Sequence, residues 1–366
     1  MPGLNRSSFL ALSWQGQLQE YVTAMDWSPD GEWLAIASGA GEVTLLNLAS
    51  RQTVVIESSG TESIDCISFS YDGQFLAAGG QNGQVKVWRM PTDSTADMKA
   101  DLTLPSLVKV LEYARNWVDR LAWSPVQNEL AFSLGRYVQV WDAAREEIVT
   151  TLSFETSSVQ DLAWHPDGEH LMLSGHLAIK IWSRLDWDAD PEVQELASAG
   201  VAIAISPDGQ YLASGNLDST LMIRGWDSPY PWCITGFPAK VRHLAWSDTN
   251  QSSAPLIAVA SGAGVIVWRK QRTDEEGWIS RVFALHYGKI VALAFQPDSS
   301  LLESAAEDGR VILWDKAKQL GQILEGATQG FSALAWNPQG TMLAAGGEQG
   351  EWRIWTQDKR GTGFLR

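Results

Sequence analysis

The sequence of 366 residues has very few cysteines and no long apolar run. Its two cysteines, Cys66 and Cys233, fall in different parts of the chain, so we expect two buried, free thiols and no disulfide, as is usual in a reducing cytoplasm. No stretch approaches the roughly 20 apolar residues that a membrane-spanning helix needs. The apolar patch Phe9–Leu12 is too short for the core of a signal peptide. We therefore expect a cytoplasmic protein with no membrane partner.

Positive charge is also scarce, with 27 Lys and Arg residues against 43 Asp and Glu residues and a formal net charge of −16. Binding to nucleic acids or to anionic membrane surfaces depends on concentrated Lys and Arg side chains. This composition therefore argues against both kinds of partner. Hydrophobic residues make up 45% of the chain and charged residues 19%, which is typical of a well-packed globular protein.

Common motifs of catalysis are missing as well: there is no phosphate-binding loop, no Gly-x-Ser-x-Gly and no Cys-x-x-Cys. Histidine is rare, and His165, His170 and His176 form the one local group. A metal site needs three or four ligands that converge on one point. Since His165 and His170 flank a predicted turn while His176 falls at the far end of the next strand, we expect no metal site and no cofactor.

What the sequence does contain is one unit that recurs eight times. Each unit begins with an apolar strand that ends in Trp, Phe or Ile, followed by a turn, a strand of small residues and a strand that ends in an aromatic residue. The residues that end the first strands are Trp27, Phe69, Trp123, Trp164, Ile205, Trp246, Phe295 and Trp336. Four of the seven intervals between them are 41 residues long. A period of about 40–45 residues is typical of propeller blades, so we predict an all-β propeller, with eight four-stranded blades favoured over seven.

The turns and the tryptophans of the repeat both have structural explanations. Turns such as Ser28–Gly31 and Ser206–Gly209 read Ser-Pro-Asp-Gly, in which Pro presets φ and Gly accepts a positive φ. Of the 19 tryptophans, five end a first strand and six end a third strand. Because these positions are equivalent from unit to unit, we assign the eleven residues to a repeated core and not to binding.

One outer strand is missing from the eighth unit, because only eleven residues follow Trp355. The segment 8–14 at the other end of the chain is a spare apolar strand. We expect it to supply the missing outer strand and so close the ring, which removes an exposed edge. The whole chain, 1–366, is then a single domain, with the first strands of its blades starting near residues 21, 63, 117, 158, 199, 240, 289 and 330.

The repeat resembles that of WD40 proteins over residues 8–357, and the dipeptide Trp-Asp itself occurs at Trp141, Trp226 and Trp314. The resemblance implies a buried hydrogen-bond tetrad of Asp, His, Ser or Thr and Trp in the better blades. Only the seventh unit has a full set of candidates: His286, Ser304, Asp308 and Trp314. The fifth unit departs most from the pattern, with Ile205 at the end of the first strand and Arg224 at the end of the third.

The resemblance further implies that partners bind the face on which the first strands begin, around the mouth of the central channel. In this acidic chain, basic and aromatic residues gather there in the third, sixth and seventh units, with one more aromatic in the eighth. We call them the mouth residues: Arg115, Trp117, Tyr137, Phe237, Lys240, Arg242, Tyr287, Lys289 and Phe331. Aromatic and Arg side chains are enriched in interface hot spots, so we expect an arc that binds an acidic or aromatic-anchored protein segment.

The function that we expect is a non-enzymatic scaffold or regulatory adaptor that binds one or more proteins or peptides and can form part of a larger assembly. Two alternatives remain open. One is a reader of modified peptides, with Trp117 in an aromatic cage for methylated residues or with Lys240, Arg242 and Lys289 as a phosphate clamp. The other is an enzyme with its site in the channel, for which Asp65 and Asp119 are the obvious carboxylates.

Overall fold

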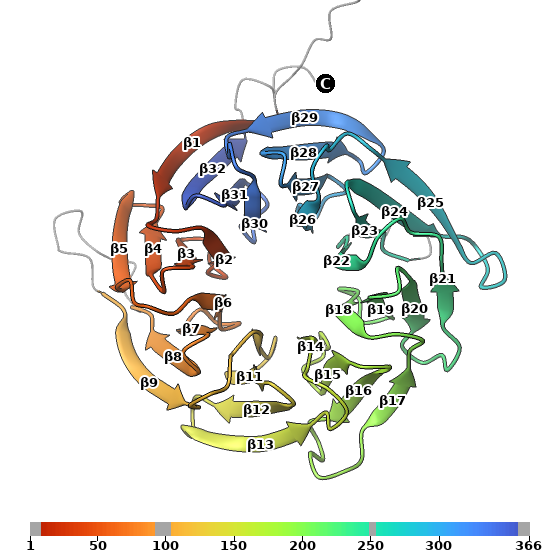
Figure 1. The fold of residues 1–366 in the computed structure, drawn as a ribbon, viewed down its shortest axis with the longest axis horizontal. Coiled ribbons are helices and arrows are strands. Elements are labelled where there is room, and N and C mark those ends of the chain that lie inside the picture. The colour runs from red at the N-terminus through yellow and green to blue at the C-terminus, as the bar shows by residue number, and fades with distance from the viewer. Residues whose placement is uncertain (1–8, 92–103, 249–253, 358–366) are drawn as a thin grey trace, which may run out of the picture.

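The computed structural model describes residues 9–91, 104–248 and 254–357, and over these residues the chain forms a ring of eight four-stranded antiparallel sheets (Figure 1). The described residues contain 32 strands and no helix. Within each sheet the strands are named a to d from the channel to the rim. The prediction of an eight-bladed all-β propeller is confirmed.

Blades 1 to 4 follow the chain order. Their strands are β2 (Val22–Trp27), β3 (Trp33–Ser38), β4 (Val43–Asn47) and β5 (Gln52–Glu57); β6 (Ile64–Phe69), β7 (Phe75–Gly80), β8 (Gln84–Arg89) and β9 (Ser106–Glu112); β10 (Leu121–Trp123), β11 (Glu129–Leu134), β12 (Tyr137–Asp142) and β13 (Glu147–Ser153); β14 (Asp161–Trp164), β15 (His170–Gly175), β16 (Ala178–Ser183) and β17 (Glu192–Glu195).

Blades 5 to 7 continue in the same way, and blade 8 takes its outer strand from the beginning of the chain. Their strands are β18 (Gly200–Ile205), β19 (Tyr211–Asn216), β20 (Leu221–Gly225) and β21 (Trp232–Ile234); β22 (Val241–Trp246), β23 (Ile257–Ser261), β24 (Gly264–Lys270) and β25 (Trp278–Phe283); β26 (Ile290–Phe295), β27 (Leu302–Ala306), β28 (Arg310–Asp315) and β29 (Gln319–Glu325); β30 (Phe331–Trp336), β31 (Met342–Gly347), β32 (Glu351–Gln357) and β1 (Leu10–Gln17).

The ring is closed by β1, which pairs antiparallel with β32 from Leu10 opposite Gln357 to Gln17 opposite Glu351. The side chain of Gln322 in blade 7 also binds this strand, since its amide donates to Leu10 O at 2.8 Å and accepts from Leu10 N at 2.9 Å. Closure by an N-terminal strand is therefore confirmed. The strand lies somewhat later than the predicted segment 8–14, of which Ser8 falls outside the described residues.

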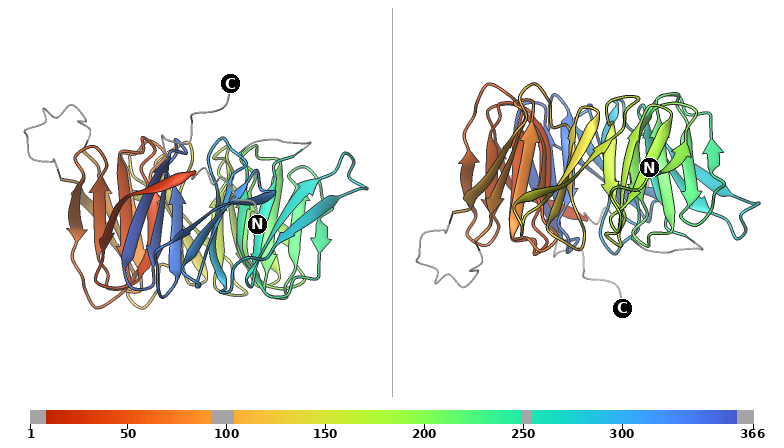
Figure 2. Two further views of the ribbon diagram at one scale, coloured as in Figure 1. Left: turned by 90° about the horizontal axis from the view of Figure 1, so that it is seen from above. Right: turned by 90° about the horizontal axis from the view of Figure 1, so that it is seen from below.

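The strands run between two faces of the ring (Figure 2). We call the face with the d–a loops and b–c turns the top, and the face with the a–b turns and c–d loops the bottom. The bottom turns are tight: in blade 1 the Ser28 hydroxyl donates to Asp30 at 2.5 Å and accepts from Trp33 N at 2.9 Å, while Gly31 has a φ of +73°. Both hairpin ends are thereby fixed by side chains within the turn itself.

The tryptophans that end the a strands join neighbouring blades. Each indole N–H reaches the preceding blade and donates to a backbone carbonyl, as Trp27 does to Ala335 at 3.1 Å and Trp246 to Ala204 at 3.2 Å. Trp336 differs, because it donates to the buried carboxyl of Glu303, whose pKa is raised well above its usual value by burial. These residues form the interfaces between blades. A buried indole stabilises such an interface through the apolar area that it removes from water and through the hydrogen bond that fixes its orientation.

The two cysteines differ in exposure. Cys66 is buried in β6, and burial raises the pKa of its thiol. Cys233 is exposed, because the short outer strand β21 has one side toward solvent. The prediction of two buried thiols is therefore wrong for Cys233.

Among the described residues there is no helix long and apolar enough to span a bilayer.

Candidate partner-binding face

Most of the mouth residues lie in top-face loops and are open to solvent. Arg115 and Trp117 lie in the loop between β9 and β10, and Tyr287 and Lys289 in the loop between β25 and β26. Large aromatic side chains are exposed in both loops: Trp117 is 57% exposed and Tyr287 is 84% exposed. Tyr137, which begins β12, is 50% exposed. Large exposed aromatics on one face are typical of a binding surface.

The mouth residues do not form one continuous arc. Each a strand contacts only those of the neighbouring blades, so the order of blades around the ring is the order of the chain. In a ring of eight, blade 3 lies opposite blade 7, as Figure 1 shows for β12 and β28. The mouth residues therefore divide into a blade-3 cluster (Arg115, Trp117 and Tyr137) and a blade-6/7 cluster (Lys240, Arg242, Tyr287 and Lys289) on opposite sides of the channel mouth.

Two predicted mouth residues lie in the core. Phe331 is completely buried at the start of β30, where its ring packs at 6.3 Å from that of Trp355, so its assignment to partner binding is wrong. The reason is its register, because the first residue of an a strand faces the neighbouring sheet, as Val22 and Ile290 do in their blades. Phe237 is half-buried, with its ring 6.2 Å from that of Trp268.

The blade-6/7 cluster is a region of concentrated positive charge. Behind it lies His243, whose pKa is lowered to about 4, first by burial and then by the charges of Lys289, Arg242 and Arg120. His243 is therefore neutral at pH 7. Lys289 has one acidic neighbour, Glu307 at 3.9 Å, and both side chains are about half exposed, so this pair neutralises little of the charge.

The tetrad of blade 7 supports this cluster from below. The Trp314 indole donates to Ser304 Oγ at 2.9 Å, Ser304 Oγ lies 2.8 Å from His286 Nε2, and His286 Nδ1 lies 3.0 Å from Asp308. Asp308 also accepts the backbone N–H of Tyr287 at 2.9 Å. The predicted tetrad residues thus form a continuous chain of hydrogen bonds that ends on the backbone of Tyr287, the most exposed aromatic residue in the part of the chain that the structure describes.

Arg120, which was not predicted, reaches the channel wall and lies 3.3 Å from Asp161 Oδ1 of the next blade. The pKa of Asp161 is nevertheless raised, because its burial outweighs the charge of Arg120. Asp119 has a raised pKa too, from burial first and then from the charge of Asp65. Asp65 accepts a hydrogen bond of 2.5 Å from the Ser63 hydroxyl. These groups form a polar belt below the channel mouth.

A second basic region lies on the bottom rim between blades 6 and 7. It is a cavity of about 400 Å³ with an apolar floor that includes Leu256, Val267 and Ile279. Four cationic side chains surround the floor: Arg269, Arg281, Lys316 and Lys318. We call it the rim groove. The sequence gives little signal for it, since its residues come from two blades and only the fold brings them together.

Two of the three histidines of the local group come together on the bottom face. His165 and His170 lie beside Asp167, whereas His176 lies beyond the other end of β15. Asp167 joins the two histidines, so three potential metal-ligating side chains lie together here, a juxtaposition that was not predicted from the sequence. The sequence did contain the signal, since residues that flank a four-residue turn become cross-strand neighbours.

Comparison with known proteins supports the fold. The chain matches the family profile "WD domain, G-beta repeat" at residues 146–183, 192–227, 277–315 and 318–356, and that of the anaphase-promoting complex subunit 4 WD40 domain at residues 4–71. A chromatin assembly factor 1 subunit FAS2 homolog from Oryza sativa is 30% identical over 36% of this chain and 26% of its own length. The uncharacterized WD repeat-containing protein sll1491 from Synechocystis is 27% identical over 37% of this chain and 35% of its own length.

The chain thus spans roughly a quarter to a third of the length of these relatives. Among solved structures, Sqt1 from Chaetomium thermophilum bound to the N-terminus of the ribosomal protein L10 has a TM-score of 0.80, with 17% identity over 92% of this chain and 97% of that one. Together the two family profiles cover more than half of the sequence. The chain belongs to the WD40-repeat protein family.

Proposed function

We propose that this protein is a non-enzymatic, cytoplasmic scaffold that binds a segment of a partner protein on its top face, at the blade-6/7 cluster. The observation that carries the proposal is the position of Tyr287, which is 84% exposed and has its backbone N–H bound to the buried tetrad through Asp308. A fixed, exposed aromatic residue loses little conformational entropy when a partner covers it, which is a property of hot spots.

Charge supports the same location. The protein has a net charge of −16, yet Lys240 and Arg242 at the start of blade 6 and Lys289 at the start of blade 7 are exposed on the same side of the channel mouth as Tyr287. The basic cluster attracts acidic segments, while the acidic remainder of the protein repels them elsewhere. The structural neighbour Sqt1, which shares the fold, binds a terminal peptide of another protein. The expected partner is therefore an acidic segment with at least one apolar anchor.

A test is quantitative affinity purification of the tagged full chain from cells that express it, followed by mass spectrometry. We expect Tyr287→Ala together with Arg242→Ala to reduce capture of specific partners at least about tenfold, as for a hot spot worth about 1.4 kcal/mol or more. The matched control is Arg281→Ala in the rim groove, which likewise removes one positive charge and leaves the top face unchanged. Trp117→Ala tests the blade-3 cluster separately.

Circular dichroism first checks that the variants are folded. If the folded Tyr287→Ala, Arg242→Ala variant captures as much partner as the native protein, the blade-6/7 cluster is ruled out as the partner site. Loss of capture only in the rim-groove control would move the partner site to the bottom face. Loss only with Trp117→Ala would assign binding to the blade-3 cluster.

A reader of phosphorylated peptides is the second candidate, favoured by the cations Lys289, Arg242 and Arg120 around His243, whose pKa is lowered first by burial and then by their charges. Phosphate is bound by such convergent cations through charge-assisted hydrogen bonds. An array of matched phosphorylated and unphosphorylated peptides separates the two functions. A scaffold for acidic segments binds both members of a pair, whereas a phosphate reader binds only the phosphorylated one.

A further inference from the structure

The a–b turn of blade 4 differs from those of blades 1 and 5 by one residue. The turns of blades 1 and 5 begin with Ser, and each hydroxyl donates to the Asp two residues later, at 2.5 Å for Ser28 and 2.6 Å for Ser206. Blade 4 has His165 at this position, and its Nδ1 lies 2.9 Å from Asp167 Oδ2. An imidazole therefore replaces a hydroxyl in a turn that otherwise keeps the same form.

The hydrogen bonds of His165 show which ring nitrogen carries the proton. Nε2 lies 3.0 Å from the carbonyl oxygen of Gly209, which can only accept, so Nε2 is the donor. Nδ1 accepts the backbone N–H of Asp167 at 3.3 Å and therefore presents a lone pair. Since Asp167 Oδ2 is also an acceptor, two lone pairs face each other at 2.9 Å. Such a contact needs a positive charge between the two atoms, supplied either by a second proton on His165 or by a metal ion that both atoms bind.

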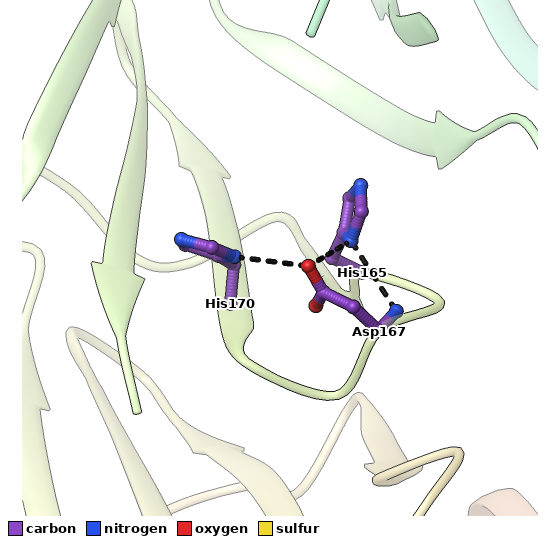
Figure 3. A group of neighbouring side chains, drawn as sticks. All are labelled: His165, Asp167 and His170. Carbon is purple, nitrogen blue, oxygen red and sulfur yellow. Dashed lines mark hydrogen bonds and ion pairs between the residues drawn. The ribbon is translucent and has the colours of Figure 1, made fainter. Parts of the chain in front are cut away.

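A third donor atom faces the same oxygen. Nδ1 of His170 lies 3.5 Å from Asp167 Oδ2 and has no hydrogen-bond partner among the described residues (Figure 3). The three donor atoms all lie within 4.8 Å of one another. Bonds of about 2.0–2.2 Å in a tetrahedron place neighbouring ligand atoms roughly 3.3–3.5 Å apart. The His170–Asp167 distance of 3.5 Å matches this spacing, and the His165–Asp167 distance of 2.9 Å is shorter, so His165 has to move slightly away from Asp167 when an ion binds.

The surroundings hold these ligands in place. The Gly209 carbonyl orients His165 from the neighbouring blade, and the Glu169 N–H donates to Asp167 Oδ1 at 2.7 Å, which leaves Oδ2 free to bind. The ring of Trp226 lies 4.1 Å from that of His165 and covers one side of the site. His165 is only 6% exposed, while Asp167 and His170 are open enough for an ion to enter. Hydrogen bonds that orient the ligand side chains in this way are typical of metal centres.

We propose that His165, Asp167 and His170 form a Zn²⁺ site on the bottom face of blade 4, with the fourth coordination position open to water or to a partner's ligand. Two imidazoles and one carboxylate suit zinc, and three protein ligands with an open position are typical of zinc sites that are not purely structural. The site is separate from the top-face cluster, so the two can be tested independently.

The test is isothermal titration calorimetry of the full chain with ZnCl₂ after treatment with a chelator, at pH 7.5. We expect one Zn²⁺ per chain in the native protein and binding at least about 100-fold weaker in His165→Ser, which restores the Ser-Pro-Asp-Gly turn of blades 1 and 5. The matched control is His176→Ser, which removes a histidine outside the site and leaves binding unchanged. Titration with Co²⁺ adds the visible absorption bands of tetrahedral cobalt.

His170→Gln is a second variant if His165→Ser does not fold, and it should also weaken binding and remove the cobalt bands. The proposal is overturned if the native protein takes up no stoichiometric Zn²⁺, or if His165→Ser and His170→Gln bind Zn²⁺ as the native protein does. Equal loss in His176→Ser would overturn it as well, because binding would then not depend on this site.

Discussion

Blades 7 and 5 keep the same two polar residues at the same positions but use them differently. In both, a Ser in strand b is followed four residues later by an Asp in the b–c turn, while the other two tetrad positions differ. In tetrad order the corresponding residues are His286, Ser304, Asp308 and Trp314 in blade 7 and Leu196, Ser214, Asp218 and Arg224 in blade 5.

Without the histidine and the tryptophan, the hydrogen bonds of blade 5 remain within its own turn. Ser214 donates to Asn216, Asn216 donates to Thr220, and Thr220 donates to Asp218, at 2.9, 2.9 and 2.7 Å. None of these bonds reaches the loop before β18. In blade 7 the Asp instead binds the loop before β26 through Tyr287 N. Blade 5 shows that strand pairing is sufficient to form a blade without the tetrad. In blade 7 the tetrad additionally fixes the top-face loop that precedes β26.

The largest effect is expected when the two aspartates, Asp308 of blade 7 and Asp218 of blade 5, are replaced. Asp308→Ala removes hydrogen bonds to His286 and to the N–H groups of Tyr287 and Arg310 at a buried position. We expect the free energy of unfolding to fall by about 2–4 kcal/mol. Asp218→Ala is the matched control in blade 5 and should cost less than about 1 kcal/mol, because Asp218 is exposed. Chemical unfolding followed by circular dichroism measures both, and equal losses would mean that the tetrad is not a stabilising unit.

The next test concerns the residue that replaces tryptophan in blade 5. Arg224 is buried, with its side chain 6% exposed, and its guanidinium pairs with Glu192 at 2.6 Å. Glu192→Ala leaves a buried charge without its partner, so we expect a loss of about 1–2 kcal/mol. Arg224→Met removes the charge and keeps the apolar volume, and it should cost less than about 1 kcal/mol. A larger loss for Arg224→Met than for Glu192→Ala in the same unfolding assay would contradict this account.

The smallest test uses pH. Burial raises the pKa of Asp308, but hydrogen bonds from Tyr287 N–H and His286 outweigh it and hold the pKa below the ordinary value of 3.8. A lowered folded-state pKa means that the stabilisation is present above pH 3.8 and is lost as the pH falls through the folded pKa. The difference in unfolding free energy between native protein and Asp308→Ala should therefore be larger at pH 7 than at pH 3. A constant difference would show that ionised Asp308 contributes nothing.

Much of the fold follows from the sequence, because equivalent positions repeat and each repeat is independent evidence. The eight blades and the closing strand could be derived from the spacing of residues such as Trp123 and Trp164 and from the missing outer strand. The burial of Phe331 could have been derived as well, since Val22 and Ile290 hold the same position in their blades. Register along a strand decides exposure more strongly than residue type does.

The candidate sites were less accessible to sequence reasoning. The separation of Trp117 from Tyr287 follows from the ring, in which the third and seventh of eight blades are opposite, and not from any local pattern. His165 and His170 meet because the hairpin folds back, yet the role of Trp226 depends on the packing of blade 5 against blade 4. Contacts between blades arise from tertiary packing, which has no period along the chain.

The pairing of Leu10 with Gln357 also has a consequence for biosynthesis. Strand β1 is synthesised before the other described strands and its partner β32 after them, so blades 1 to 7 can form in order while the eighth sheet stays incomplete until β32 is made. Until then, the edge of β1 and the blade-1 side of the last interface have no partner. Ring closure is therefore the last step in the assembly of the eight blades, and before it the unpaired edges are open to aggregation.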